Sequence, residues 1–464
     1  MSSDCNTASV LHELVTSYEA KASLNDRLID QYTLTLDKRT AQHSSPGLIP
    51  AINQILMDTD YDAIDPRRSL IALLQKFLSY LTFKEILNYY PENFILENLY
   101  QSCGTASIVS LEIINVNIDQ ASTKEFIRKN GVVPRLLEVY FNPGTSIAVL
   151  NQIQIMSERV DDAVDLVRPS SDLFYSARKS KDPVLLARLL DVLLILLPKM
   201  PVDPSLYLFS GDEILKYTDD LIFTILIVQF YTKLIGMNFP IEDALKDLLK
   251  IFTSGPDVDE MVKLEIADLI AKMSYNNYNS ILEASNVFKT YNLLPVFDKD
   301  EAYIRLLSRC NPDLIHASTP AIYEDVLAHL ALFDARFFPI LLNFIKSKPV
   351  WIYLQPRLTK DRLSKLPKNL LFHLLLEMAR FNYSGEYLFN QLPSILTDEL
   401  LESDVRNNEI WNLKLQVLEA LTNLEAVPGY DYWQGKLKEC YNVMRFGQSY
   451  KNIQPKVDII DETA

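Results

Sequence analysis

The chain has 464 residues, of which 48% are hydrophobic, and it carries a formal net charge of −15 at pH 7. An acidic chain repels phosphate, so the composition excludes a general affinity for nucleic acid or for an anionic membrane surface. Glycine is scarce, with 11 residues, and leucine and isoleucine dominate the apolar positions. This composition indicates helices joined by short turns, with enough apolar surface to bury a large core.

The sequence carries no signal for secretion or membrane insertion. Residues 1–10 are polar and lack the regions of a signal peptide. The most apolar windows, 184–197 and 221–228, do not qualify as membrane spans, because the first contains charges and the second is too short. The four cysteines are far apart, and no pair has the spacing of a metal or redox motif. We therefore expect a soluble, cytoplasmic protein, with the nucleus as an open second location.

Amphipathic patterns predict a first helical pair within residues 8–37. The polar segment 38–46 is expected to be a loop, and a helix is expected to follow at 48–57. A further helix at 67–81 is expected to start at Asp65-Pro66, because this is the order of an N-cap and a first helical turn. The N-terminal part is therefore predicted to be entirely helical, without strands.

The clearest repeat signal lies in residues 123–158. There a helix is expected to end at Asn130-Gly131, and Pro134 opens the next helix, in which the pair Leu136 and Leu137 follows. A third helix comes after a short turn, as in armadillo units. Further helical units are expected at 171–198, 211–236, 240–273, 278–308 and 320–346. Their period of about 40 residues is that of HEAT and armadillo repeats. We expect an all-α fold, a single continuous α-solenoid of about eleven repeats over residues 1–446, followed by a polar, disordered tail at 447–464.

The unit at 211–236 is predicted to be a helical hairpin, because acidic pairs at Asp212-Glu213 and Asp219-Asp220 mark two helix N-termini. On a helical wheel, its second helix has two opposite apolar seams: Phe223, Ile227, Phe230 and Leu234, and Leu221, Ile225, Val228 and Thr232. The two narrow edges between the seams consist of Asp219, Ile222, Leu226, Gln229 and Lys233, and of Asp220, Thr224 and Tyr231. One edge is expected to face the helix behind it and the other to face solvent or a partner.

Residues 346–368 differ in character, with seven basic residues, one acidic residue, three prolines, and the aromatics Trp351 and Tyr353. Positive charge combined with aromatic rings could bind an acidic partner or single-stranded nucleic acid. A solvated connector that balances an acidic chain is the favoured interpretation, because no other segment adds to a basic groove.

The sequence offers no pattern for catalysis. None of the five histidines stands at metal-ligand spacing from another, and no phosphate-binding loop, nucleophile elbow or kinase signature occurs. We therefore expect a protein that is not an enzyme and that has no cofactor, metal site or small-molecule substrate.

Polar residues at helical spacing on successive helices could form a mixed-charge concave ribbon for a protein partner, if these helices line up. The candidates are Glu112, Asn115, Arg188, Asp191, Asp219, Gln229, Lys233, Glu265 and Asp268. The alternative interpretation is that they are ordinary solvent-facing residues.

Two stretches carry a family resemblance. The first contains Glu213-Ile214-Leu215-Lys216, Asp220 and Tyr231-Thr232-Lys233, and the second contains Arg380, Tyr383, Leu388, Asn390 and Pro393. Both are similar to the yeast family of HEAT-repeat chaperones that assemble the base of the proteasome regulatory particle. That family is also linked by name to DNA mismatch repair and is related to proteasome non-ATPase regulatory subunit 5.

The resemblance implies a C-shaped solenoid that binds the C-terminal domain of a proteasomal AAA ATPase subunit on its concave face and is released before the proteasome is complete. It also suggests a neighbouring ATPase subunit and a large non-ATPase base subunit as partners. In the family the position of Leu226 can be acidic, which selects the edge with Ile222 and Leu226 as the open one. The alternative hypothesis is a scaffold in a DNA-repair or nucleic-acid-associated complex that acts through residues 346–368.

Overall fold

The computed structural model describes residues 2–160, 170–253, 258–288, 301–402, 405–424 and 427–447. Every regular element within these ranges is a helix, which confirms the prediction of an all-α, helical-repeat fold. The chain divides into two compact units, Met1–Phe209 and Ser210–Ala464. The predicted tail lies outside the described residues except for Gly447, and the single continuous solenoid stays a prediction.

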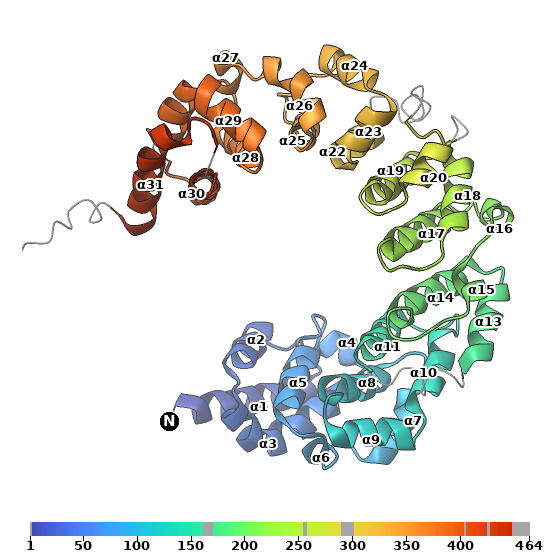
Figure 1. The fold of residues 1–464 in the computed structure, drawn as a ribbon. Helices are drawn as coiled ribbons and strands as arrows, with labels where there is room; N and C mark the ends of the chain where they lie inside the picture. The colour runs from blue at the N-terminus through green and yellow to red at the C-terminus, as the bar shows by residue number, and fades with distance from the viewer. Residues whose placement is uncertain are drawn as a thin grey trace, which may run out of the picture. The chain divides into compact units, whose positions relative to one another are not determined.

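The first unit is a stack of helical layers. Its helices are α1 (Ser2–Ala20), α2 (Asp26–Thr35), α3 (Lys38–Leu56), α4 (Tyr61–Ile64), α5 (Ser69–Tyr80), α6 (Phe83–Ile86), α7 (Glu92–Leu99), α8 (Thr105–Asn117), α9 (Ala121–Lys129), α10 (Val132–Tyr140), α11 (Ile147–Arg159), α13 (Ser171–Lys179), α14 (Pro183–Leu196) and α15 (Pro204–Tyr207). The helices α1, α3, α5, α8, α11 and α14 form a row in which each packs against the next (Figure 1). The helices α2, α7, α10 and α13 cover this row. Because each layer contacts its sequence neighbours, the unit is built as helical repeats.

The second unit repeats this plan. Its helices are α16 (Gly211–Leu215), α17 (Leu221–Leu234), α18 (Glu242–Thr253), α19 (Glu260–Ser274), α20 (Asn279–Ala284), α22 (Glu301–Arg309), α23 (Pro312–Ser318), α24 (Ala321–His329), α25 (Phe338–Ile345), α26 (Lys348–Leu354), η3 (Gln355–Arg357), α27 (Lys360–Leu363), α28 (Lys368–Met378), α29 (Asn382–Gln391), η4 (Ile395–Leu401), α30 (Asn408–Thr422) and α31 (Tyr430–Phe446). The helices α17, α19, α22, α25, α28 and α30 pack in succession. We call them the principal row of the second unit (Figure 1).

Side-chain caps fix the starts of several predicted helices. Asp220 accepts a hydrogen bond from the Phe223 amide (3.0 Å) at the start of α17, and Asp182 accepts one from the Val184 amide (2.9 Å) at the start of α14. These bonds satisfy amides that have no partner within the helix. Asp65 also caps its helix as predicted, but it bonds the amides of residues 69 and 70, so α5 begins two residues later than expected.

The armadillo-like unit is confirmed by its backbone. Gly131 has a φ of +58° and separates α9 from α10. A left-handed conformation of this kind is accessible to glycine without the steric cost that a Cβ atom brings. The pair Leu136 and Leu137 of α10 is buried, and α11 follows as the third helix. The predicted order of a glycine stop, a proline in the next first turn and a leucine pair is therefore present.

The expected loop at 38–46 is wrong, because these residues belong to α3. Asp37 caps this helix by accepting a hydrogen bond from the Thr40 amide (2.7 Å). Pro46 inside the helix has no N–H for the Gln42 carbonyl, and the Ser45 hydroxyl donates to that carbonyl instead (3.3 Å). Small polar residues thus replace a missing backbone bond and allow a proline within the helix.

The basic stretch 346–368 is not a solvated connector, because it folds into α26, η3 and α27. Trp351 is only 4% exposed, and its ring packs against those of Tyr383 and Tyr387. The tryptophan therefore belongs to the core of the second unit.

Two lysines of the same stretch are neutralised by carboxylates from a later element. Lys360 pairs with Asp398 (3.2 Å), and Lys368 pairs with Glu399. Both carboxylates come from η4, so these ion pairs link the basic stretch to the helical stack that follows it.

Candidate protein-binding site

The open edge of α17 combines apolar and charged side chains. Ile222 is 73% exposed, Leu226 and Gln229 are half-buried, and Asp219 and Lys233 are exposed. The opposite edge is covered, since Thr224 and Tyr231 are buried. The edge that sequence and resemblance selected as open is therefore the exposed one.

The two apolar seams of α17 are buried to different degrees. The seam of Phe223, Ile227, Phe230 and Leu234 is fully buried, as predicted. Of the second seam only Val228 is buried, while Leu221, Ile225 and Thr232 remain partly exposed. The helix is thus enclosed more firmly on one side than its symmetric pattern predicted.

Helix α19 presents an edge of the same kind. Each edge residue of α17 from Ile222 onward has a counterpart 39 positions later on α19, and the two helices pack against each other in the principal row. Met261, the counterpart of Ile222, is 57% exposed, and Glu265 and Asp268 are half-buried. We call Asp219, Ile222, Leu226, Gln229, Lys233, Met261, Glu265 and Asp268 the α17/α19 surface.

Sequence reasoning missed Met261, because a methionine without charge did not enter a search for mixed-charge residues. The 39-residue register from Ile222 would have found it. An exposed isoleucine and an exposed methionine at matched positions give the surface an apolar centre, which charged residues alone do not provide.

The charges of the α17/α19 surface fall into two classes. Asp268 forms ion pairs with Arg305 (3.3 Å) and Arg309 (2.7 Å) of α22, so its charge is already compensated. Among the described residues, Asp219 and Lys233 form no ion pair. These two charges, one of each sign, are therefore available to a partner molecule.

The N-terminal members of the predicted ribbon do not lie on an open surface. Glu112 and Asn115 of α8 are 7% and 3% exposed. The Asn115 Nδ2 donates to the Gln152 carbonyl (2.9 Å) and to its Oε1 (2.7 Å). Burial raises the pKa of the Glu112 carboxyl, against hydrogen bonds from Gln75 and Gln152 that lower it. Both residues hold α8 against its neighbours rather than face solvent.

Arg188 is also a buried structural residue, with 9% exposure. Its Nη1 donates to the carbonyls of Tyr140 (2.8 Å) and Asn142 (2.7 Å) at the end of α10. Asp191, one turn later, is half-buried, and its charge adds to the effect of burial in raising the pKa of the Tyr140 phenol. The prediction that Glu112, Asn115 and Arg188 belong to an exposed ribbon is therefore wrong, because all three are buried and make interior contacts.

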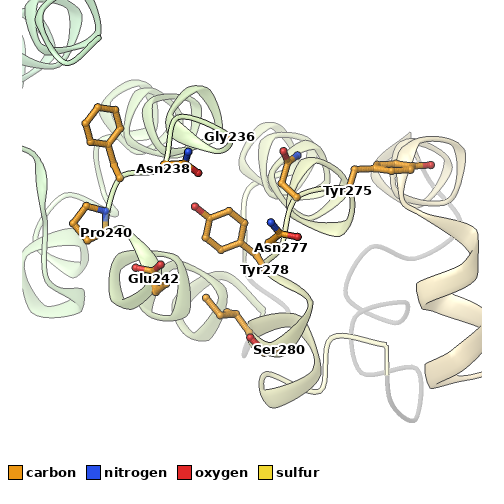
Figure 2. A pocket seen from close by; sticks show the side chains of 11 residues that line it. Gly236, Asn238, Pro240, Glu242, Tyr275, Asn277, Tyr278 and Ser280 are labelled. Carbon is orange, nitrogen blue, oxygen red and sulfur yellow. The ribbon is translucent and has the colours of Figure 1, made fainter. Parts of the chain in front are cut away.

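A pocket of about 630 Å³ lies at the turns that follow α17 and α19. Figure 2 shows the Tyr278 ring between these two turns, with Asn238, Glu242 and Asn277 around it. Burial and the negative charge of Glu242 raise the pKa of Tyr278, so its hydroxyl stays protonated and can donate a hydrogen bond. The pocket can receive a polar or cationic side chain at the carboxyl ends of the helices that form the α17/α19 surface.

The described residues contain no cluster of histidine, cysteine, aspartate or glutamate able to hold a metal ion. In the same ranges, no helix combines the length and the apolar character that a membrane span requires.

The second stretch that carried the resemblance has structural contacts. The Tyr383 hydroxyl donates to the Ile345 carbonyl (2.6 Å), and the Asn390 Nδ2 donates to the Pro428 carbonyl (3.2 Å). Each bond joins neighbouring layers of the second unit.

The stacked helical layers define a helical-repeat protein. The mixed apolar and charged edge along its principal row is a surface of the type that such proteins use to bind partners. The family model "DNA mismatch repair protein HSM3, N terminal domain" matches residues 8–236, and the corresponding C-terminal domain matches residues 239–464. The chain belongs to the HSM3 family, which confirms the resemblance. The two family domains meet in the turn after α17, within the pocket lining.

Two relatives match this chain over almost its whole length, and a more distant one matches over three quarters of it. The chain is 44% identical to the DNA mismatch repair protein HSM3 of Candida albicans, covering 98% of each chain. It is 37% identical to the protein of that name from Scheffersomyces stipitis, covering 99% of this chain and 98% of the relative. The protein of that name from Saccharomyces cerevisiae is 18% identical over 75% of each chain.

Proposed function

We propose that this protein is a non-catalytic assembly chaperone for the base of the proteasome regulatory particle. It binds the C-terminal domain of a proteasomal AAA ATPase subunit through the α17/α19 surface and leaves before or on completion of the proteasome. The exposure of Ile222 and Met261 at matched positions of two packed helices carries this proposal. An apolar centre beside the unpaired charges of Asp219 and Lys233 has the composition of a protein-binding site.

The balance of forces at this surface suits a chaperone. Mixed charges give orientation and selectivity more than raw affinity, and two exposed apolar side chains make a small hydrophobic centre. A moderate, reversible affinity allows later subunits to displace the protein. A neighbouring ATPase subunit and a large non-ATPase base subunit are further partners in this proposal, which places the protein in the cytoplasm and the nucleus.

Affinity purification from cells with mass spectrometry tests the role. A proteasomal ATPase subunit should co-purify, and finished proteasomes should lack the protein. Retention in mature particles at equal stoichiometry contradicts the proposal.

A double change, Asp219→Arg with Gln229→Arg, tests the surface. We expect weaker binding of the ATPase domain, because two new positive charges join Lys233 on one edge. The control is Asp243→Arg with Asn423→Arg, which makes the same charge change at exposed positions on α18 and at the end of α30. If the two double variants bind the ATPase domain with equal affinity, the domain does not bind at the α17/α19 surface.

The names of the relatives support a second candidate, a scaffold in DNA mismatch repair. In that case the basic stretch 346–368 contacts DNA or a DNA-bound partner. Salt-dependent DNA binding that is lost on neutralising Lys360, Arg362 and Lys365 would favour it. If the chain does not bind DNA even at low salt, this second candidate function is excluded. The burial of Trp351 leaves that ring unable to stack on a base.

A further inference from the structure

A second pocket, of about 440 Å³, lies between the segment that follows α24 and the elements η3 and α27. Its lining consists of Leu327, Ala328, His329, Leu330, Ala331, Leu332, Phe333, Leu354, Arg357 and Arg362. The two arginines belong to the basic stretch 346–368, whose charge the proposed function leaves without a role. The volume is within the range of small ligand pockets, about 300–1,000 Å³.

The two arginines differ from the lysines of the same stretch. Lys360 and Lys368 are neutralised by carboxylates, whereas Arg357 and Arg362 form no ion pair with the residues that the structure describes. Arg357 Nη1 donates to the Leu327 carbonyl (3.3 Å) at the end of α24, which offsets the negative end of that helix. Arg362 lies over the Phe333 ring, with its guanidinium carbon 5.8 Å from the ring centre.

These contacts hold the arginines in place, and most of their N–H groups have no acceptor in the part of the chain that the structure describes. A guanidinium that keeps free N–H donors binds a carboxylate through paired hydrogen bonds. No acidic residue is among the described residues that line the pocket, although the chain as a whole carries a net charge of −15. The pocket is therefore a positively charged site on a chain of net negative charge, and it can bind an anionic group.

Apart from His329, whose Nδ1 lies 2.8 Å from an Asp325 carboxylate oxygen, the remaining side chains of the lining are apolar. Leu332 and Leu354 are buried at the base, and Leu327, Leu330 and Phe333 are half-buried around it. An aliphatic side chain that enters beside the arginines would cover this apolar surface and remove it from water, which favours binding. Cationic and aliphatic walls together fit a ligand that carries both a carboxylate and an aliphatic group.

We propose that the Arg357/Arg362 pocket binds a short acidic and aliphatic peptide segment of a partner protein. An aspartate or glutamate carboxylate accepts hydrogen bonds from Arg357 and Arg362, and a neighbouring leucine or isoleucine packs on Leu330 and Leu354. Nucleic acid fits this pocket less well. Arg362 covers the Phe333 ring, and the net negative charge repels a polyanion more than it repels one or two carboxylates. This inference does not depend on the α17/α19 surface.

Fluorescence anisotropy with the full chain tests the proposal. The probe is a fluorescein-labelled peptide of alternating leucine and glutamate, and its twin carries glutamine in place of glutamate. The variant is Arg357→Gln with Arg362→Gln. The control is Lys346→Gln with Lys365→Gln, which removes the same charge from two exposed positions of the same stretch outside the pocket. Circular dichroism verifies that both variants keep their helices.

We expect the acidic peptide to bind at least about tenfold more tightly than its twin. The arginine variant should lose about tenfold or more in affinity, and the lysine variant should lose less than about threefold. Equal losses in both variants, or equal binding of both peptides, would overturn the proposal, because general charge would then explain the binding. Binding of an oligothymidine probe without binding of the acidic peptide would also overturn it, in favour of nucleic acid.

Discussion

Lys272 and Thr232 join the two helices that carry the candidate surface, because the Lys272 Nζ donates to the Thr232 carbonyl at 2.7 Å. Thr232 lies in the last turn of α17, where carbonyl groups lack a partner within the helix. A positive charge at this end also interacts favourably with the helix dipole. One side chain of α19 thus satisfies a carbonyl in the last turn of α17 and links the two helices.

Replacing Lys272 with methionine should therefore destabilise the second unit by about 1.5–3 kcal/mol, the range of a hydrogen bond to a charged group. Lys233→Met is the control, because Lys233 is exposed and forms no ion pair among the described residues, and its cost should stay within about 0.5 kcal/mol. Urea unfolding followed by tryptophan emission measures both. Equal midpoints for the two variants would show that the bond contributes nothing measurable.

The apolar centre of the α17/α19 surface gives a second prediction. Ile222→Asp with Met261→Asp should weaken binding of the proteasomal ATPase domain by about tenfold or more, since aspartates replace the central apolar contacts. The matched control is Ile352→Asp with Tyr432→Asp, because each of these side chains is 68% exposed in the same unit. Calorimetric titration with the isolated ATPase domain compares the two variants. Similar losses would mean that added negative charge alone explains the effect.

Glu112 gives a pH prediction. Burial raises its pKa above the ordinary value of 4.5, so the folded chain keeps this proton to higher pH than the unfolded chain does. The stability that Glu112 contributes is complete below the unfolded pKa and is lost as pH rises through the folded pKa. Glu112→Gln stays neutral, so its stability relative to the parent chain should increase as pH rises above 4.5 and then level off. Urea unfolding between pH 4.5 and pH 8 measures the difference, and a difference that does not change with pH would contradict the assignment.

Arg188 gives a stability prediction for the first unit. Arg188→Met leaves the Tyr140 carbonyl without its donor in a buried site, and it should cost about 1–3 kcal/mol. The Asn142 carbonyl keeps the amide of Thr145 as a donor (3.0 Å). Arg188→Lys can restore one donor and should recover part of this loss. Urea unfolding followed by far-UV circular dichroism is the measurement. A loss below about 1 kcal/mol would mean that another donor reaches the Tyr140 carbonyl.

A structural feature of this protein could be predicted from the sequence when the residues that form it are close together in the chain. The caps Asp182 and Asp220 bond amides two or three residues away, so local pattern predicts them. The two apolar seams of α17 leave only two narrow strips between them, so local pattern reduces the open edge to two candidates, and the family resemblance selected between these two.

The burial of Asn115 and Arg188 could not be predicted in the same way. Their partners Gln152 and Tyr140 lie 37 and 48 residues away. A polar residue at helical spacing has the same pattern whether it faces solvent or a neighbouring repeat. The missed helix at 38–46 has a related cause, since the Ser45 hydroxyl that bonds the Gln42 carbonyl is a side-chain contact that helix propensity does not include.

The burial of Trp351 in the second unit has a spectroscopic consequence. Trp433 is buried there as well and donates its Nε1 hydrogen to the Phe389 carbonyl (3.2 Å). Trp411, the third tryptophan of the chain, belongs to the same unit. Indole emission therefore reports on the second unit alone, while circular dichroism averages the helices of both. Unfolding curves that coincide for the two signals mean that the units unfold as one cooperative block, and separated curves give the stability of each unit without any added label.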